Sequence, residues 1–431
     1  MIAFLSFVIT CILTSFFYFP IEFSFLPGIN TKMILAVIGI LFFVMTELQR
    51  KEFRIHRDLL IIVVFAIIVS ILGTLSMVVN GTNDTAYATY IISMLVWLSS
   101  AYCVCCIIKI VEGNLSIRSV FTYVTIVCVV QCVLALLIDN YPGIKSFVDA
   151  YINQDQLFLN KVDRLYGIGA SLDTAGARFS ACLVMIAVLA NEQSTENRFV
   201  SYLYLLAFVF ISIIGNMIAR TTSVGVLLGV GYLMLMTLGR RNGFLVIRRL
   251  ITILVVAVPI CFLLYNNNSE FRQLLRFGFE GFFSLFEEGE WAVSSNEKLQ
   301  TMVVFPETLK TWIIGDGYFD SPNSDMSFLG ELTNSGYYMD TDIGYLRFIF
   351  YFGLMGLFSF IFFFFVIARV CCKFYPSYGL SIVLILVVGL IVWLKVSTDM
   401  FLVFALFLAT GFVNYTDDDH KIDSNTSNEL T

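Results

Sequence analysis

Several charged residues stand where apolar stretches of this sequence end, and their types suit the handling of an anion. Arg164 and Arg178 lie in the segment NKVDRLYGIGASLDTAGARFSACL, and Asp173 precedes Arg178 by five residues. Arginine offers planar, bidentate donors that fit a phosphate group. The alternative for Arg178 is that its side chain only reaches the membrane interface to solvate its own charge.

A third arginine, Arg220, lies in IARTTSVG, between two apolar stretches with almost no connection between them. A charge at the end of so tight a hairpin must be solvated or paired. The neighbouring Thr221, Thr222 and Ser223 could cap the next helix or bind an anion together with Arg220. An interfacial arginine without a ligand is the alternative.

The segment DTDIGYLRFIFYFGLMGLF places Asp340 and Asp342 just before an apolar span and Arg347 about one turn inside it. Because an arginine facing lipid is costly, Arg347 is expected to face the bundle interior or a wet cavity. A nearby arginine is expected to keep the Asp342 carboxylate ionised, which suits a base or a sugar-binding group. A helix cap with a structural ion pair is the alternative.

The remaining composition limits the chemistry. The only histidines are His56 and His420, both predicted on the cytoplasmic side, so acid–base chemistry on the outer face must use carboxylates, tyrosines or substrate groups. The sequence has no nucleotide-binding motif, and its ten cysteines, all in or beside apolar stretches, have no histidine near them that would indicate a metal site. No cofactor and no nucleic-acid partner are expected.

The elements that would hold these residues are membrane helices. Of the 431 residues 58% are hydrophobic and 13% charged, with a mean hydropathy of +0.86, whereas about 25% of the residues of a soluble domain are charged. The sequence therefore predicts an all-α polytopic membrane protein with one helical domain over 1–414. About twelve spans are expected, near 2–19, 33–48, 59–79, 88–108, 119–138, 177–191, 199–219, 222–239, 250–265, 343–368, 378–395 and 399–414.

Lysine and arginine in the short loops predict the orientation. The loops QRKEFRIHRD and GRRNGFLVIRR are basic, while the opposite short loops hold one arginine between them. The positive-inside rule then places both termini in the cytoplasm. The acidic tail 415–431 is expected to be disordered. Two longer loops, about 139–176 and 266–342, fall on the outer face.

The second outer loop contains FRQLLRFGFEGFFSLFEE, over 271–288, and the turn signal GDGYF, over 315–319. The segment 271–288 predicts either an amphipathic helix on the outer leaflet or a helix packed under the loop. The helix packed under the loop, a structural role, is favoured.

Four features together resemble the O-antigen and capsule polymerase family, the Wzy-type polysaccharide polymerases. They are RLYGIGASLDTAGARFS before a span, the ART hairpin at 219–221, a long outer loop with IGDGYF, and DIGYLRFIFYFGLMGLF with its paired glycines. The resemblance covers roughly 160–360 and the overall topology. It implies a GT-C-like membrane glycosyltransferase in the bacterial inner membrane.

Such enzymes join oligosaccharide repeat units carried on undecaprenyl diphosphate, at the outer face, in O-antigen, capsule or exopolysaccharide synthesis. The resemblance implies that Arg164, Arg178, Arg220 and Arg347 hold diphosphates, and that Asp173 and Asp342 position or deprotonate the acceptor hydroxyl. It also implies a chain-length regulator and a flippase as partners. Aromatic side chains that could stack on sugar rings are Tyr318, Phe319, Tyr337, Tyr338 and Tyr345.

Two other functions remain open. O-antigen ligases share the topology, but that family relies on a loop histidine, which the predicted outer loops lack. A flippase or transporter of lipid-linked oligosaccharides would show short loops and internal symmetry, and this sequence shows neither.

Overall fold

The computed structural model describes residues 2–49, 56–154, 159, 164–239, 243–321 and 336–428, and the side chains of these residues except 238–239, 243 and 415–428. Five basic residues used for the orientation lie outside the described residues: Arg50, Lys51, Arg54, Arg240 and Arg241. So do parts of both long loops, at 155–158, 160–163 and 322–335.

The described chain is mainly helical, and eight of its helices are long and apolar enough to cross a membrane. They are α2 (Thr31–Gln49), α3 (Arg57–Asn80), α4 (Tyr90–Glu112), α5 (Ile117–Asn140), α8 (Leu172–Glu196), α9 (Arg198–Ile218), α11 (Gly243–Asn267) and α16 (Gly344–Phe374). Four further apolar helices have shorter apolar parts: α1 (Ile2–Tyr18), α10 (Thr222–Gly239), α17 (Gly379–Val392) and α18 (Phe401–Asn428). An all-α polytopic membrane protein is thereby confirmed, while twelve spans stays a prediction.

The observed helices fall on the predicted stretches but often extend beyond them. α8 covers 172–196 where 177–191 was expected, and α18 continues to Asn428, into the segment expected to be disordered. Neither glycine nor proline occurs between Val413 and Asn428, and adding one residue to an existing helix costs little compared with starting one. A hydropathy window detects only the apolar part of such a helix.

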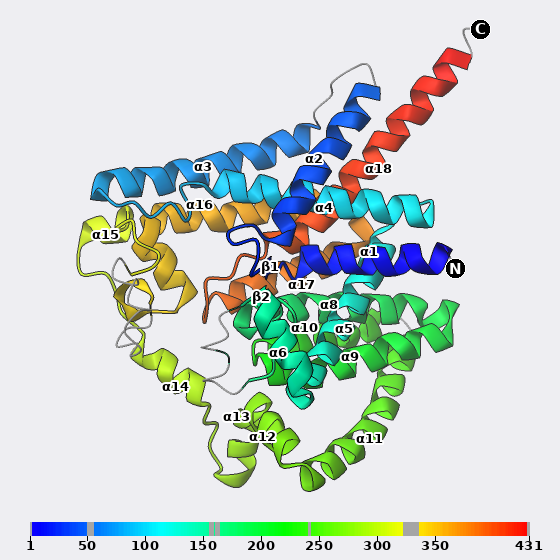
Figure 1. Cartoon of the computed structure of the whole chain (residues 1–431), viewed down its shortest axis with the longest axis vertical. Helices are drawn as coiled ribbons and strands as arrows, with labels where there is room; N and C mark the ends of the chain where they lie inside the picture. The colour runs from blue at the N-terminus through cyan, green and yellow to red at the C-terminus, as the bar shows by residue number, and fades with distance from the viewer. Residues whose placement is uncertain are drawn as a thin grey trace.

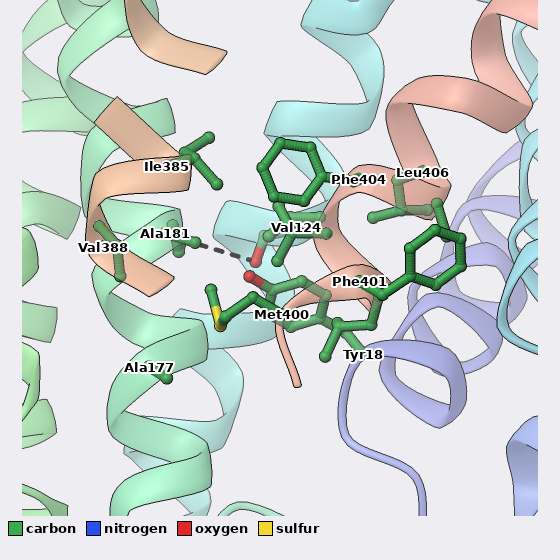
Figure 2. Packing of buried hydrophobic residues seen from close by; sticks show 14 of the residues in the cluster. Tyr18, Val124, Ala177, Ala181, Ile385, Val388, Met400, Phe401, Phe404 and Leu406 are labelled. Atoms are coloured by element: carbon green, nitrogen blue, oxygen red, sulfur yellow. Dashed lines mark hydrogen bonds between the residues drawn. The ribbon is translucent and has the colours of Figure 1, made fainter. Parts of the chain in front are cut away.

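Helix α8 is the centre of the bundle. Its residues from Ala175 to Ala190 are all buried, and α5, α9, α10, α11 and α17 pack against it. Small residues permit this: a methyl group on Gly225 would lie 2.2 Å from Cα of Ser180, so α10 touches the backbone of α8. Figure 2 shows Ala177 and Ala181 of α8 in one packed group with Ile385 and Val388 of α17, Met400 and Phe404.

Connections between the helices alternate between two ends of the bundle. One end, here called the loop-rich end, holds the described parts of the connections that follow α1, α3, α5, α9, α11 and α17, namely 19–30, 81–89, 141–154, 164–171, 219–221, 268–321, 336–343 and 393–400. Two of them pair as a two-stranded antiparallel sheet, β1 (Glu22–Phe23) with β2 (Ile152–Asn153). Two others are joined where the Thr82 hydroxyl donates to the Gly317 carbonyl over 2.8 Å.

The opposite end is held by separate contacts. Arg118 forms ion pairs with Glu192 and Glu196 at 3.2 and 3.1 Å, and Lys373 pairs with Asp58 at 2.7 Å. Successive apolar helices therefore run in alternate directions, as a chain that crosses a membrane repeatedly would.

Short helices occupy the long loop that follows α11. These are α12 (Ser269–Gly278), α13 (Glu280–Glu287), α14 (Ser294–Thr301), α15 (Leu309–Ile313) and the 3-10 helix η2 (Tyr338–Asp340), while α6 (Pro142–Tyr151) lies in the other long loop and the 3-10 helix η3 (Pro376–Tyr378) precedes α17. The single helix expected over 271–288 is instead broken at Phe279. In Figure 1 α11 leads away from the bundle to α12 and α13, and α14 and α15 then return toward α3 and α16.

A break in α16 explains the Gly-Asp-Gly turn. At Gly353 the backbone has φ 66° and ψ −174°, so the carbonyls before it lose their helical partners. The amides of Asp316 and Gly317 donate to the carbonyls of Phe350 and Tyr351 over 2.6 and 3.1 Å. The turn therefore satisfies the backbone groups that the break exposes.

Substituting Gly353 by alanine is expected to destabilise the protein strongly. The φ/ψ pair at Gly353 is adopted almost only by glycine, and a side chain there would cost about 1–3 kcal/mol in backbone strain alone. Its methyl group would also lie 2.1 Å from the carbonyl oxygen of Ile313. Thermal unfolding of the protein in detergent should show a clear drop in Tm.

The matched control is Gly231→Ala in α10. A methyl group at Gly231 meets no atom within 4 Å, and alanine in a helix is favoured by about 0.5–1 kcal/mol over glycine. This variant should melt at the parental temperature or slightly above. Equal melting of the two variants would contradict the strain at Gly353.

Candidate functional site

Asp173 lies in the first turn of α8 and pairs with a residue that the motifs did not indicate. Its Oδ1 is 2.8 Å from Nζ of Lys395, in the connection between α17 and α18, and accepts a hydrogen bond from Thr221 at 3.3 Å. Leu172, just before it, has a φ of 51°, a left-handed conformation that is uncommon for a residue other than glycine. Two connections of the loop-rich end, 219–221 and 393–400, therefore meet the first turn of α8 at this carboxylate.

Asp342 precedes α16, and Arg347 follows in the first turn. Arg347 is 6% exposed, so the prediction that it faces the interior is confirmed. It donates to Asp320 Oδ1 over 2.7 Å, to the Phe319 carbonyl over 3.1 Å and to the Ser397 hydroxyl over 3.0 Å. Its Nη1 lies 4.0 Å from Asp342. Two consecutive non-glycine residues with positive φ, at 339 and 340, lead into this segment.

The two carboxylates belong to one arrangement, because Asp342 interacts electrostatically with Asp173, Lys395 and Lys298 as well as with Arg347. Burial raises the pKa of Asp342 to about 6, Arg347 opposes that rise and the negative charge of Asp173 adds to it. Burial outweighs the arginine in setting this pKa, although a carboxyl group with a pKa of about 6 is still ionised at neutral pH, as was expected for Asp342. Asp173, Asp342, Arg347 and Lys395 are called the charged cluster below.

Arg164 and Arg220 meet at one aromatic ring beside this cluster. Their guanidinium carbons lie 4.6 and 4.2 Å from the centre of the Phe277 ring. Burial lowers the pKa of both groups, while Asp173 raises that of Arg164 and Glu280 that of Arg220. The pair places two positive charges close to the carboxylate of Asp173.

Arg220 is engaged by the protein. It pairs with Glu280 at 2.7 Å and donates to the Phe277 carbonyl over 2.8 Å and to Ser295 over 3.0 Å. The neighbouring hydroxyl of Thr222 points elsewhere and donates to the Gly215 carbonyl, so it does not form an anion site together with Arg220. Arg220 thus fastens the α9–α10 hairpin to the segment containing α12, α13 and α14.

Arg178 lies more than one turn deeper in α8 and is 7% exposed. Its Nε has no hydrogen-bond acceptor among the described residues. The carboxylate of Asp399 interacts with both Arg178 and Lys32, and it accepts a hydrogen bond from Tyr90 over 3.2 Å. Two cations, the buried Arg178 and the half-buried Lys32, therefore interact with one carboxylate, so these three side chains carry one more positive charge than negative.

The aromatic residues divide into two groups. Phe319 and Tyr337 cover Arg347 at 3.7 and 4.3 Å, and Tyr318 stacks on Tyr338 with 5.3 Å between ring centres. These four lie near the charged cluster or the Gly-Asp-Gly turn. By contrast, the hydroxyl of Tyr345 donates to the Leu390 carbonyl over 2.8 Å, which gives this residue a packing role.

The structure thus gathers Arg164, Asp173, Arg220, Asp342 and Arg347 at the loop-rich end, places Arg178 one layer deeper, and adds residues that sequence reasoning missed. The missed residues are Lys32, Asp320, Lys395 and Asp399. Lys395 and Asp399 did carry a signal, since charges between two apolar stretches only a few residues apart need partners. Among the described residues, no three histidine, cysteine or carboxylate side chains come together as metal ligands.

Removing Lys395 is expected to lower stability through Asp173. A hydrogen bond to a charged group contributes about 1.5–3 kcal/mol, and both side chains are about four-fifths buried. Lys395→Met should lower the Tm in detergent. The double variant with Asp173→Asn should lose less than the sum of the single variants, because contacting residues couple by about 0.5–3 kcal/mol.

Lys373→Met is the matched control. Lys373 also pairs with an aspartate, Asp58, but at the opposite end and with a side chain that is 66% exposed. Exposed ion pairs contribute little, so its Tm should change less than that of Lys395→Met. Additive losses in the Asp173 and Lys395 double variant would contradict the coupling.

Comparison of the whole chain with protein-family models, curated proteins and solved structures finds no match to any of them.

Proposed function

We propose that this protein is a polysaccharide polymerase that joins oligosaccharide repeat units carried on undecaprenyl diphosphate at the outer face of the bacterial inner membrane. The loop-rich end would be the outer face and both termini would lie in the cytoplasm. The observation that carries the proposal is the charged cluster, in which a largely buried carboxylate with a raised pKa lies beside cations at one end of a membrane bundle.

The reaction needs a base for the acceptor and positive charge for the leaving group. The acceptor hydroxyl oxygen forms a bond to the anomeric carbon of the donor glycan, and the bond from that carbon to the lipid diphosphate breaks. The hydroxyl proton passes to Asp342, and the diphosphate leaves with the bonding electrons. A base with a pKa of about 6 is ionised at neutral pH and close enough to that pH to accept a proton efficiently.

The arginines suit the leaving group. Arg178 is buried and its Nε lacks an acceptor within the described chain, and donors in a dry site stabilise developing negative charge more than donors in water. Arg164 also has a buried Nε for which the described residues offer no acceptor. Tyr318 and Tyr338 offer stacked rings at the same end for a sugar chain.

The position of His56 supports a polymerase over a ligase that depends on an outer-loop histidine. His56 caps α3 by accepting from the amide of Asp58, and its ring contacts Phe374 at the end of α16 and Phe412. Because α16 begins beside the charged cluster and ends beside His56, this histidine is at the opposite end. The side chain of His420 lies outside the described residues.

A deletion strain tests the proposal, with surface glycan and lipid-linked sugars resolved by gel and mass spectrometry. A surface that carries single repeat units only, or single repeats held on the lipid at the outer face, is expected. Long polymer held on the carrier lipid would identify a ligase, and single repeats trapped in the cytoplasmic leaflet a flippase. An unchanged glycan profile would overturn the polysaccharide proposal. Complementation with the wild-type chain is the control.

A further inference from the structure

Helix α11 fixes the level of the bilayer in this part of the molecule. It is long and apolar enough to span a membrane, but little of its surface is covered by the protein. Val258, Phe262 and Leu263 are each about 60% exposed. In a membrane protein such a surface contacts lipid. The end of α11 at Asn267 therefore lies close to the headgroups of the leaflet at the loop-rich end.

Two contacts hold α13 at that level. The ring of Tyr265, near the end of α11, stacks on Phe283 of α13 with 5.8 Å between centres and 11° between planes. Arg276 donates to the Tyr265 hydroxyl over 3.1 Å and to Glu287 at the end of α13 over 2.7 Å. These contacts hold α13 beside the last turns of α11, a helix that faces lipid.

The outer side of α13 is apolar and uncovered. Phe282, Leu285 and Phe286 recur at the spacing of one helix face, and Phe286 is 86% exposed. Trp291 is 54% exposed and meets the Phe282 ring edge-on at 5.1 Å. These four residues are called the α13 apolar face.

The other side of α13 is polar. A cleft of about 460 Å³ lies there, lined by Glu280, Phe283, Ser284 and Glu287 of α13 and by Arg220 and Arg276. α13 is therefore amphipathic in its folded position, and it separates a polar cleft from an exposed apolar surface.

We propose that the α13 apolar face is immersed in the bilayer, at the boundary between headgroups and acyl chains of the leaflet at the loop-rich end. Aromatic side chains favour this boundary, and the face continues the lipid-facing surface of α11. Glu287, Glu288 and Glu290 border the face, so it fits zwitterionic headgroups and repels anionic ones. The inference does not depend on the reaction proposed above.

Fluorescence quenching in nanodiscs tests this contact with the full-length protein. The lipid is phosphatidylcholine brominated either near the headgroup end of one acyl chain or near its methyl end. Trp97 and Trp393 are buried, and the contribution of Trp291 is obtained by comparing the parent with Trp291→Phe. With bromine near the headgroup, the fluorescence of the parent should be quenched more than that of Trp291→Phe. With bromine near the methyl end, the parent and the variant should be quenched to nearly the same extent.

A second variant shows whether the whole face is responsible. Phe282→Ser, Leu285→Ser and Phe286→Ser combined should abolish the Trp291 quenching, while the matched change Val303→Ser, at an exposed apolar residue beyond α14, should leave it. Equal quenching of the parent and Trp291→Phe by both lipids would overturn the proposal. Absence of quenching together with crosslinking of two protein copies through this face would also overturn it, because a second copy would then be the partner of the face.

Discussion

Replacing Asp342 by asparagine is expected to give a protein that withstands heating better than the parent at neutral pH and forms no polymer. Asparagine has nearly the same shape but can neither ionise nor accept a proton from a hydroxyl. The two effects have one cause, because the burial that raises the pKa of Asp342 also makes its ionised form costly in the folded state.

The pH dependence of the stability effect follows from the sign of the shift. The folded-state pKa, about 6, is above the ordinary value of 3.8, so the folded protein binds a proton that the unfolded chain has released. At a pH below both values the carboxyl is neutral in both states and costs nothing. Stability is lost as the pH rises from about 4 through about 6, by on the order of 3 kcal/mol for a shift of this size.

Melting in detergent at several pH values, together with glycan analysis of the complemented strain, checks both effects. The Tm advantage of Asp342→Asn should be full above pH 6 and disappear toward pH 4. Asp173→Asn is the matched control, since Asp173 is paired with Lys395 at 2.8 Å and its replacement should lower the Tm. Retained polymer in Asp342→Asn would remove this residue as the base, and a lowered Tm at neutral pH would contradict the cost of its burial.

The membrane helices could be predicted from the sequence because their signal is local. Each apolar stretch is visible by itself, and the observed helices overlap the predicted ones throughout. The ends could not be predicted, because turns such as 172–176 of α8 are helical through packing and not through hydropathy. The break at Gly353 also had no hydropathy signal, since it depends on a distant turn at residues 315–317.

The candidate site could be predicted as a set of residue types but not as an arrangement. Arg347 was expected to face inward because a charge just inside a span has few alternatives. Its partner Asp320 and the link between Asp173 and Lys395 join residues that are 27 and 222 positions apart. The pKa of Asp342 depends on how deeply the surrounding loops bury it, which no motif states. The sequence therefore identifies single charged residues more readily than their ion-pair partners or their pKa values.

Arg178→Met is expected to remove polymer without lowering the Tm. Arg178 is 7% exposed, and its Nε has no acceptor in the part of the chain that the structure describes. Burying a charged group that is not fully hydrogen-bonded is costly, and an apolar side chain of similar volume at this position removes that cost. Lys32 remains beside Asp399 in this variant, so that carboxylate keeps a cation nearby.

Arg220→Met should behave differently, although both arginines are expected to serve the same reaction. It removes the ion pair with Glu280 at 2.7 Å and the hydrogen bond to the Phe277 carbonyl, so the Tm should fall together with the amount of polymer. Arg249→Met is the matched control, because Arg249 is also 7% exposed and its Nη1 has no acceptor among the residues that the structure describes, but it contacts the Ser194 carbonyl at the opposite end.

These three variants separate an anion-binding role from a structural one. The control should keep full polymer, and its failure would mean that loss of any buried arginine disables the protein. A fall in Tm for Arg178→Met as large as that for Arg220→Met would assign Arg178 to the packing of α8. Full polymer in both the Arg178 and Arg220 variants would remove both residues from the site. Loss of polymer at a parental Tm in Arg178→Met alone would leave binding of a negatively charged group as the function of its buried guanidinium.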